Sequence, residues 1–225
     1  MKDDSRAGLS HLFVTRVISR KEITKEIIEM ALEKPQGFIF SPGQRIRLIH
    51  ERGERDYSLV SSPECSHLMI LFKVVPEGKL SPFLAEAETG ASLSFSGPHG
   101  YFLWLPSERP AVFVATGTGV APFISMARSG IRGFVMVHGA RSSEELYERS
   151  FLRGASGKYV ACLSASYSGT ETDTYRGRVT AYINSRLSPG VYDFYLCGRR
   201  EMIRDVTLLV DERFPESSVY TETFY

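Results

Sequence analysis

The first residues whose types and spacing could do chemistry are Arg55, Asp56, Tyr57 and Ser58, in the run RDYS. They stand at the start of an expected strand, where alternating side chains would place Arg55 and Tyr57 on one face and Ser58 on the other. A guanidinium suits a phosphate, and a neighbouring aromatic ring suits a flat ligand. This combination fits a flavin nucleotide, but a solvated edge strand with a surface arginine would show the same pattern.

A glycine-rich segment, ATGTGVAPF at residues 115–123, lies between an expected strand and an expected helix. Gly117 and Gly119 would allow a sharp turn that presents backbone N–H groups to a phosphate, and Pro122 suits the first helical turn. The segment predicts a loop that binds a nucleotide diphosphate. The alternative is a tight strand-to-helix turn that binds nothing.

Two further segments could bind ligands. In FKVVPEGKLSPFL, residues 72–84, a helix that starts near Ser81 would offer free N–H groups to an anion, with the Ser81 hydroxyl as its cap. In YLCGRREMI, Cys197 and Gly198 would lie at the carboxyl edge of a central strand, where doubly wound sheets bind ligands. Simple helix capping and a buried structural cysteine are the respective alternatives.

The elements that must position these residues differ between the two halves of the chain. Between residues 11 and 103, short β-type runs alternate with Gly, Pro and charged turns, which predicts an antiparallel barrel or sandwich with one helix at residues 81–88. The runs are LFVTRVIS, QRIRLIH, YSLVSS, LMILFKVV and ASLSFSG.

A proline-bounded polar stretch, LPSERP at residues 105–110, predicts a linker. After it, the apolar runs AVFVA, GFVMVH, KYVACL and VYDFYLC alternate with the helix-like stretches SSEELYERSFL and RREMIRDVTLLVDERF. Such alternation predicts an α/β domain with a doubly wound parallel sheet. We therefore expect two domains, residues 1–104 and residues 105–225.

Composition narrows the classes of partner. The chain has 225 residues, and 27 basic against 26 acidic side chains give no overall bias toward nucleic acid or an anionic membrane. Cys65, Cys162 and Cys197 lack the spacing of a disulfide framework, a zinc site or an iron–sulfur cluster. The polar first residues and the absence of a long apolar run predict a cytoplasmic protein without membrane insertion.

In this order, from FSPGQ at residues 40–44 to the terminal YTETFY, the motifs resemble the ferredoxin–NADP reductase family, especially its compact bacterial ferredoxin/flavodoxin reductases. The resemblance implies a monomer with an FAD-binding antiparallel β-barrel and an NAD(P)H-binding α/β domain. Hydride would pass between nicotinamide C4 and flavin N5, and single electrons would pass to a separate ferredoxin or flavodoxin. The alternatives are an oxygenase reductase component, a flavin reductase, or a non-catalytic FAD-holding subunit.

The resemblance also implies roles for single residues at the flavin. It assigns Arg55 to the pyrophosphate, Tyr57 to the isoalloxazine ring and Ser58 to flavin N5. The other implied FAD positions are Asp56, Phe72, Lys73, Val74, Val75, Lys79, Leu80, Ser81, Thr118 and the tail residues Phe224 and Tyr225.

For the nicotinamide nucleotide, the resemblance assigns Arg141 and Arg178 to the 2′-phosphate of NADPH. Ala165 stands where such relatives usually carry a further arginine, so NADPH is expected and NADH stays open. The resemblance implies Ser58, Cys197 and Glu222 as the catalytic set. The other implied nucleotide-binding positions are Thr116, Gly117, Gly119, Pro122, Ala140, Cys197 and Gly198.

Overall fold

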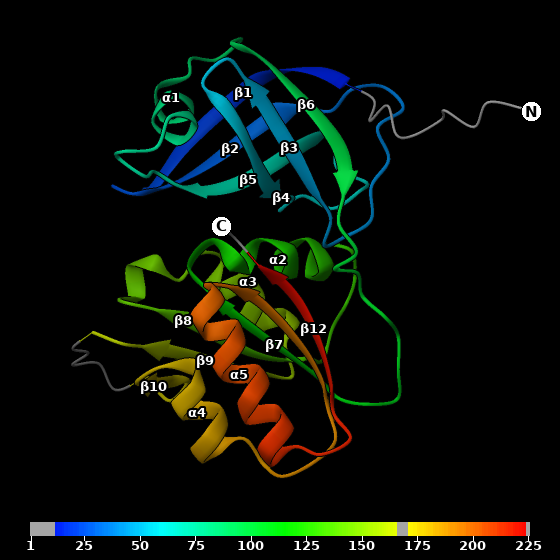
Figure 1. The fold of residues 1–225 in the computed structure, drawn as a ribbon, viewed down its shortest axis with the longest axis vertical. Helices are drawn as coiled ribbons and strands as arrows, with labels where there is room; N and C mark the ends of the chain where they lie inside the picture. Colours follow the sequence, from blue (N-terminus) through cyan, green and yellow to red (C-terminus); the bar gives the residue numbers. More distant parts are fainter. Residues whose placement is uncertain (1–11, 166–170, 224–225) are drawn as a thin grey trace, which may run out of the picture.

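The computed structural model describes residues 12–165 and 171–223, which form an antiparallel barrel-like domain followed by an α/β domain (Figure 1). Within the described residues, the first sheet has the strand order β4-β3-β6-β1-β2-β5. Its elements are β1 (Leu12–Thr24), β2 (Ile27–Glu33), β3 (Arg45–His50), β4 (Gly53–Ser58), β5 (His67–Lys73), α1 (Leu80–Glu86) and β6 (Ser92–His99).

The barrel closes where its two edge strands meet. Leu59, directly after β4, forms an antiparallel bridge with Ile70 of β5. Alternating side chains of the strands, such as Ile46 and Leu48 of β3, point inward and are buried together with Phe95 and Leu84. One face of each strand therefore fills the barrel and the other face stays available for polar side chains.

The second domain has a parallel sheet with the order β10-β9-β8-β7-β11-β12. Its strands are β7 (Ala111–Thr116), β8 (Val135–Ala140), β9 (Lys158–Leu163), β10 (Thr174–Arg176), β11 (Asp193–Gly198) and β12 (Ser218–Thr223). Its helices are η1 (Gly117–Val120), α2 (Ala121–Arg128), η2 (Ser143–Glu145), α3 (Arg149–Ala155), α4 (Val179–Arg186) and α5 (Arg200–Arg213).

Helices cover both faces of this parallel sheet, as Figure 1 shows. Helices α2 and α3 pack on one face, where Phe113, Phe123 and Leu152 share a core. Helices α4 and α5 pack on the other face, around Val114 and Val206. Since both faces are buried, the free surface of the sheet lies at the ends of its strands.

The predicted fold class is confirmed, but several elements differ from the sequence-based expectation. Strands β2, β10 and β12 and helix α4 were not predicted, and β4 begins at Gly53, two residues before the RDYS run. The expected helix over residues 142–152 is divided into η2 and α3, because Glu148 adopts the left-handed conformation with φ 55°. Short elements of this kind are specified by packing more than by periodicity.

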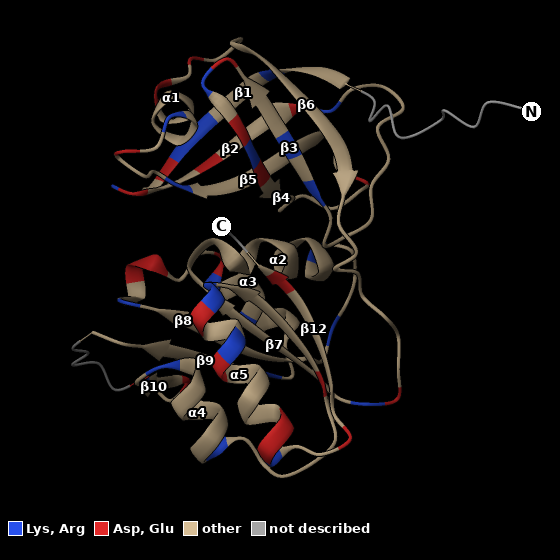
Figure 2. Cartoon of the chain, viewed as in Figure 1, with Lys and Arg blue, Asp and Glu red and all other residues tan. Residues whose placement is uncertain are grey.

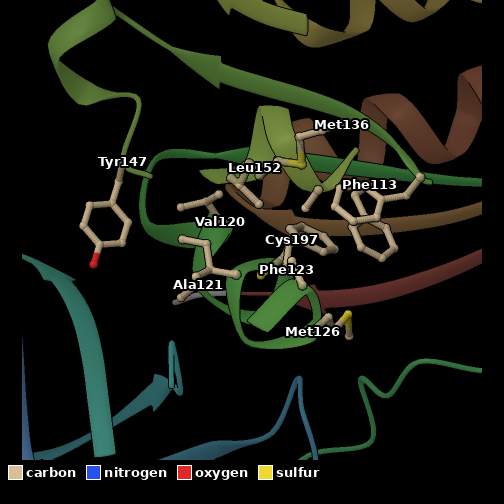
Figure 3. Close-up of a cluster of buried hydrophobic side chains, with 14 of the residues drawn as sticks. Phe113, Val120, Ala121, Phe123, Met126, Met136, Tyr147, Leu152 and Cys197 are labelled. Carbon is tan, nitrogen blue, oxygen red and sulfur yellow. The ribbon is translucent and has the colours of Figure 1, made fainter. Parts of the chain in front are cut away.

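The two domains are joined by a linker and by direct packing. The linker is anchored to the second domain, because the Leu105 N–H donates to Tyr195 Oη (3.1 Å) and Ser107 Oγ donates to Asp193 Oδ2 (2.5 Å). Across the interface, Ser125 Oγ donates to the Ser61 carbonyl at 2.7 Å, and the Tyr147 hydroxyl donates to the Glu29 carboxylate. Figure 3 shows the Tyr147 hydroxyl pointing toward the barrel.

Among residues 12–165 and 171–223, no helix is both long and apolar enough to cross a membrane.

Candidate functional site

A cleft of about 300 Å³ lies between the barrel and the carboxyl edge of the parallel sheet. It brings together six residues that the sequence predicted as ligand-binding: Lys73, Thr116, Gly117, Thr118, Arg141 and Gly198. Its other lining residues were not predicted: Thr24, Glu26, Ile27, Glu145 and Arg199. The β1–β2 turn residues among these carry no motif, and their place in the cleft follows from the docking of the two domains.

The glycine-rich segment turns sharply where β7 ends. Gly117–Val120 forms a 3₁₀ turn, and α2 follows with Pro122 in its first turn, as predicted. A Cβ at Gly119 would lie 2.6 Å from the Gly198 Cα and would collide with the Cys197 carbonyl. Only a glycine therefore allows the loop after β7 to pack directly against the end of β11.

Gly198 is the second position where a side chain is excluded. Its φ of +140° belongs to the region that glycine adopts readily, and a Cβ would collide with Thr116 Oγ1. The same Thr116 Oγ1 accepts a hydrogen bond from the Arg199 N–H at 3.2 Å. The ends of β7 and β11 are thus held together, and Thr116, Gly117 and Gly198 line the cleft there.

On the barrel side, β4 carries the RDYS run in the expected alternation. Tyr57 pairs with Ile46 and packs edge-to-face on Phe72 with 5.8 Å between ring centroids, and burial raises the pKa of its phenol to about 12. Ser58 is 2% exposed, and its hydroxyl has no hydrogen-bond partner among the described residues. An unpartnered buried hydroxyl is costly, so it favours a ligand that can supply the missing partner.

Arg55 lies on β4, a strand that contacts α1. Arg55 is exposed and its guanidinium donates to the Glu54 carbonyl at 2.7 Å, while β4 and α1 are in contact. The expectation that Ser81 caps this helix is wrong, because Lys79 is the N-cap residue and makes no side-chain cap. Ser81 is already inside the helix, and its Oγ accepts a hydrogen bond from the Val75 N–H at 3.0 Å.

Asp56 has a different environment from its neighbours in the run. Arg45 Nε lies 2.9 Å and Arg47 Nε 2.6 Å from its two carboxylate oxygens. Burial opposes ionisation of Asp56, but the hydrogen bonds from Arg47 and Arg45 outweigh it and hold the pKa below its usual value. The Asp56 side chain is therefore part of an ion-pair network on β3 and β4.

Cys197 and Glu222 are neighbours across β11 and β12. Cys197 is fully buried, and Figure 3 shows it among Val120, Ala121 and Phe123. Burial, followed by the nearby Glu222 carboxylate, raises the pKa of the Cys197 thiol, so this thiol stays protonated at neutral pH. Burial also raises the pKa of Glu222, while Arg45 lowers it.

Of the remaining predicted residues that the structure describes, Lys73 lines the cleft and the others do not. Lys73 lines it and pairs with Glu26 at 2.8 Å, whereas Phe72 and Leu80 belong to the barrel core. Val74, Val75 and Lys79 lie between β5 and α1, and Ala140 ends β8. Arg178 is the exposed N-cap residue of α4 and does not line the cleft, and Phe224 and Tyr225 lie outside the described residues.

Comparison with known proteins agrees with this architecture. Residues 14–104 match the oxidoreductase FAD-binding domain family, and residues 113–207 match the oxidoreductase NAD-binding domain family. A solved ferredoxin NADP⁺ reductase from Neisseria gonorrhoeae with bound FAD and NADP superposes with a TM-score of 0.80 at 21% identity, covering 95% of this chain and 99% of that chain. That likeness establishes the shared fold.

Two relatives more than 30% identical match most of this chain. The 2-halobenzoate 1,2-dioxygenase electron transfer component of Burkholderia cepacia is 31% identical over 87% of this chain, which spans 62% of the length of that relative. Ferredoxin–NADP reductase B of Sorangium cellulosum is 33% identical over 76% of this chain and 77% of that protein. The chain therefore belongs to the ferredoxin–NADP reductase family of FAD- and NAD(P)-binding oxidoreductases.

Proposed function

We propose that the chain is an FAD-dependent NAD(P)H oxidoreductase that exchanges electrons with a separate one-electron carrier protein. The observation that carries this proposal is the cleft between the domains, which brings the glycine-rich loop of one half against the barrel of the other. The sequence matches to an FAD-binding and an NAD-binding domain support the same assignment.

The barrel residues fit a flavin. The unpartnered, buried Ser58 hydroxyl requires a hydrogen-bond partner, and a heteroatom at the reactive edge of an isoalloxazine ring would supply it. Tyr57 on the same strand would hold the ring by stacking, and the exposed Arg55 guanidinium would bind the pyrophosphate.

The strand ends of the second domain fit a dinucleotide. Gly117 and Gly198 line the cleft, and Gly119 lets the loop after β7 pack against the end of β11, so a ring and a phosphate could approach the strand ends closely. Arg141 follows β8 and Arg199 follows β11, so they lie on either side of the loop after β7. Lys73 is paired with Glu26, whereas neither arginine forms a salt bridge within residues 12–165 and 171–223.

In this proposal, Arg199 binds the phosphate on the nicotinamide side and Arg141, with Arg178, binds the 2′-phosphate of NADPH. Arginine suits such contacts because its planar fork donates two parallel hydrogen bonds. Ala165 adds no charge at the end of β9, where its N–H donates to the Arg141 carbonyl at 3.0 Å. NADPH is therefore the expected donor, with NADH as the alternative.

A bound flavin would supply the hydride acceptor for nicotinamide C4, at N5, and the one-electron donor for the carrier. The residues of the chain would orient and desolvate this reaction. Ser58 would hold the flavin edge from the barrel, Gly198 would leave room for the nicotinamide ring, and the buried Cys197 thiol would stay neutral at the end of β11. Alignment of the two rings is the main contribution that a protein makes to such a transfer.

The proposed electron partner is a ferredoxin or a flavodoxin. A second candidate is the terminal component of an oxygenase, because several relatives of 28–31% identity are named dioxygenase electron transfer components. Stopped-flow reoxidation of the reduced protein by a ferredoxin, a flavodoxin and an oxygenase would separate these acceptors. The carrier that reoxidises the flavin fastest at equal concentration identifies the class.

One experiment tests the core of the proposal. The visible spectrum of the purified chain should show the absorption of bound flavin. Anaerobic mixing with NADPH or NADH in a stopped-flow spectrometer should bleach this absorption within seconds. A chain that binds no flavin, or a bound flavin that stays oxidised with both nucleotides, would contradict the reductase assignment. The ratio of the two bleaching rates measures the nucleotide preference directly.

A further inference from the structure

Arg45 joins the two domains through an ion pair. It lies on β3, and its Nη1 is 2.5 Å from Glu222 Oε1 on β12, while its Nε is 2.9 Å from Asp56 Oδ2 on β4. The Glu222 side chain is 10% exposed and the Arg45 side chain 25% exposed, so water screens this pair weakly. Figure 2 shows the acidic segment near the end of β12 on the side that faces the barrel.

The strand register shows which positions of the two domains this ion pair connects. Arg45 is the direct partner of Ser58 in the β3–β4 ladder, and Glu222 is the direct partner of Cys197 in the β11–β12 ladder. Residues opposite one another in a ladder lie close together, so a shift of one affects the position of the other. The Arg45–Glu222 pair therefore connects the strand position beside the proposed flavin edge with the position beside the proposed nicotinamide ring.

The groups around Glu222 leave Arg45 as its main counter-charge. Asp56 of β4 repels its negative charge, and the neutral Cys197 thiol of β11 lies beside it. Arg47 of β3 is engaged with Asp56, and His99 of β6 bonds Ser96 Oγ at 2.9 Å. Burial alone would favour the protonated form of Glu222, so its charge depends on Arg45.

Resting on the function proposed above, we propose that Arg45 is a positioning residue for hydride transfer, which aligns β11 and β12 with β4 through its ion pair with Glu222. Arg45 acts through Glu222 and Asp56. Because sub-ångström alignment of reacting rings governs the rate of such a transfer, loss of the pair should slow the reaction even when both ligands still bind.

The test compares R45M with R47M in the flavin-loaded chain. Both substitutions remove an arginine that binds Asp56, but only Arg45 also binds Glu222, so R47M is the matched control. We expect R45M to slow flavin bleaching by saturating NADPH at least tenfold and R47M to change it less than twofold. E222Q should slow it as R45M does, and the double variant should be no slower than either single variant.

The pH profile separates positioning from simple structural support. In R45M the Glu222 carboxylate loses its opposite charge, so the rise of the bleaching rate with pH should move upward by about one to three pH units. The same substitution with E222Q should remove this shift, and Arg45→Lys, which retains the charge, should restore a profile near that of the wild type. A purely structural role would lower the thermal midpoint of R45M without moving the profile.

Failure of the proposed function and failure of the proposed role of Arg45 give different results. A wild-type flavin that NADPH and NADH do not bleach would contradict the proposed function itself. A wild type that is bleached while R45M keeps the same rate and profile, or while R47M is equally impaired, would contradict the role of Arg45 alone. If R45M does not fold, E222Q and Arg45→Lys test the role of Arg45 in its place. Bleaching of the E222Q flavin by NADPH at the wild-type rate would overturn the inference.

Discussion

The two halves of the molecule build their parts of the cleft by different means. In the barrel, the candidate ligand contacts are side chains within a paired strand, such as Arg55, Tyr57 and Ser58 of β4. In the α/β domain they are mainly backbone positions at the ends of the strands, at Gly117 and Gly198, where the buried Gly119 lets the loop pack against β11.

Sheet architecture explains the difference. An antiparallel barrel has one buried and one open face, so alternate side chains of a strand are available to a ligand. A parallel sheet covered by helices on both faces leaves free only the ends of its strands, where turns present N–H groups. Substitution of a side chain should therefore impair the barrel site, and addition of a Cβ should impair the α/β site.

The largest effect on binding of the nicotinamide nucleotide should come from Gly198→Ala. The new Cβ would collide with Thr116 Oγ1 and lie 2.9 Å from the Thr116 carbonyl oxygen, at a φ of +140°. Strain of about 1–3 kcal/mol would displace the strand end, so we expect at least a tenfold rise in the KM for NADPH with FAD content unchanged. Gly154→Ala in α3, where a Cβ meets nothing within 4 Å, is the control. Equal KM values for NADPH in the two variants would contradict the claim that addition of a Cβ impairs the α/β site.

Arg55→Ala tests the barrel side of the same comparison. Loss of charge-assisted hydrogen bonds to a phosphate is worth about 1.5–3 kcal/mol, so FAD affinity should fall by roughly tenfold to a hundredfold. Fluorescence titration of the apoprotein with FAD measures it. Arg20→Ala, which removes an exposed arginine from β1, should leave affinity unchanged. A variant with full affinity would remove Arg55 from the FAD site.

Acid should lower the stability of the two domains over different pH ranges. Burial lowers the pKa of His138 in the α/β core from 6.5 to about 3, and its Nδ1 is 3.0 Å from Tyr159 Oη. Because the unfolded chain takes up this proton first, the His138 contribution to stability is complete above pH 6.5. It declines by about 1.4 kcal/mol per pH unit below that value. The Asp56 contribution in the barrel also declines with acid, but only near and below its ordinary pKa of 3.8.

Urea unfolding at pH 7.5 and pH 5.5 measures this dependence. His138→Asn removes the titrating group, so its free energy of unfolding should change less between these two pH values than that of the wild type. An equal change in both proteins would show that His138 does not control the acid sensitivity of the α/β core.

Arg199→Gln should have the smallest effect, and it tests the exception to the comparison, a side chain that lines the α/β part of the cleft. If Arg199 binds a phosphate common to both nucleotides, the KM values for NADPH and NADH should rise together by about fivefold, equivalent to about 1 kcal/mol. Arg141→Gln should instead raise the KM for NADPH more than that for NADH. Arg200→Gln controls for the loss of one charge beside Arg199, and a selective effect of Arg199→Gln on NADPH would reassign it to the 2′-phosphate.

Much of the fold and part of the site were predictable because their signals are local. Period-two runs and then strand–helix alternation indicate the two domain classes, and the turn chemistry of Gly117, Gly119 and Pro122 places a loop directly after β7. Other features had no local signal. Strand β2 pairs with both β1 and β5 within the barrel, and the three-residue β10 is an edge strand.

The amino-acid sequence by itself determined the order of the domains, the RDYS strand and the glycine-rich loop, because propensity and periodicity act over a few neighbouring residues. Only the tertiary structure decided that Ser81 binds the Val75 N–H, that Asp56 is held by two arginines, and that the Ser58 hydroxyl has no hydrogen-bond partner in the described part of the chain. It also placed Arg45 against Glu222, 177 positions away in the chain. Such contacts depend on strand register and domain docking, which arise when the whole chain packs.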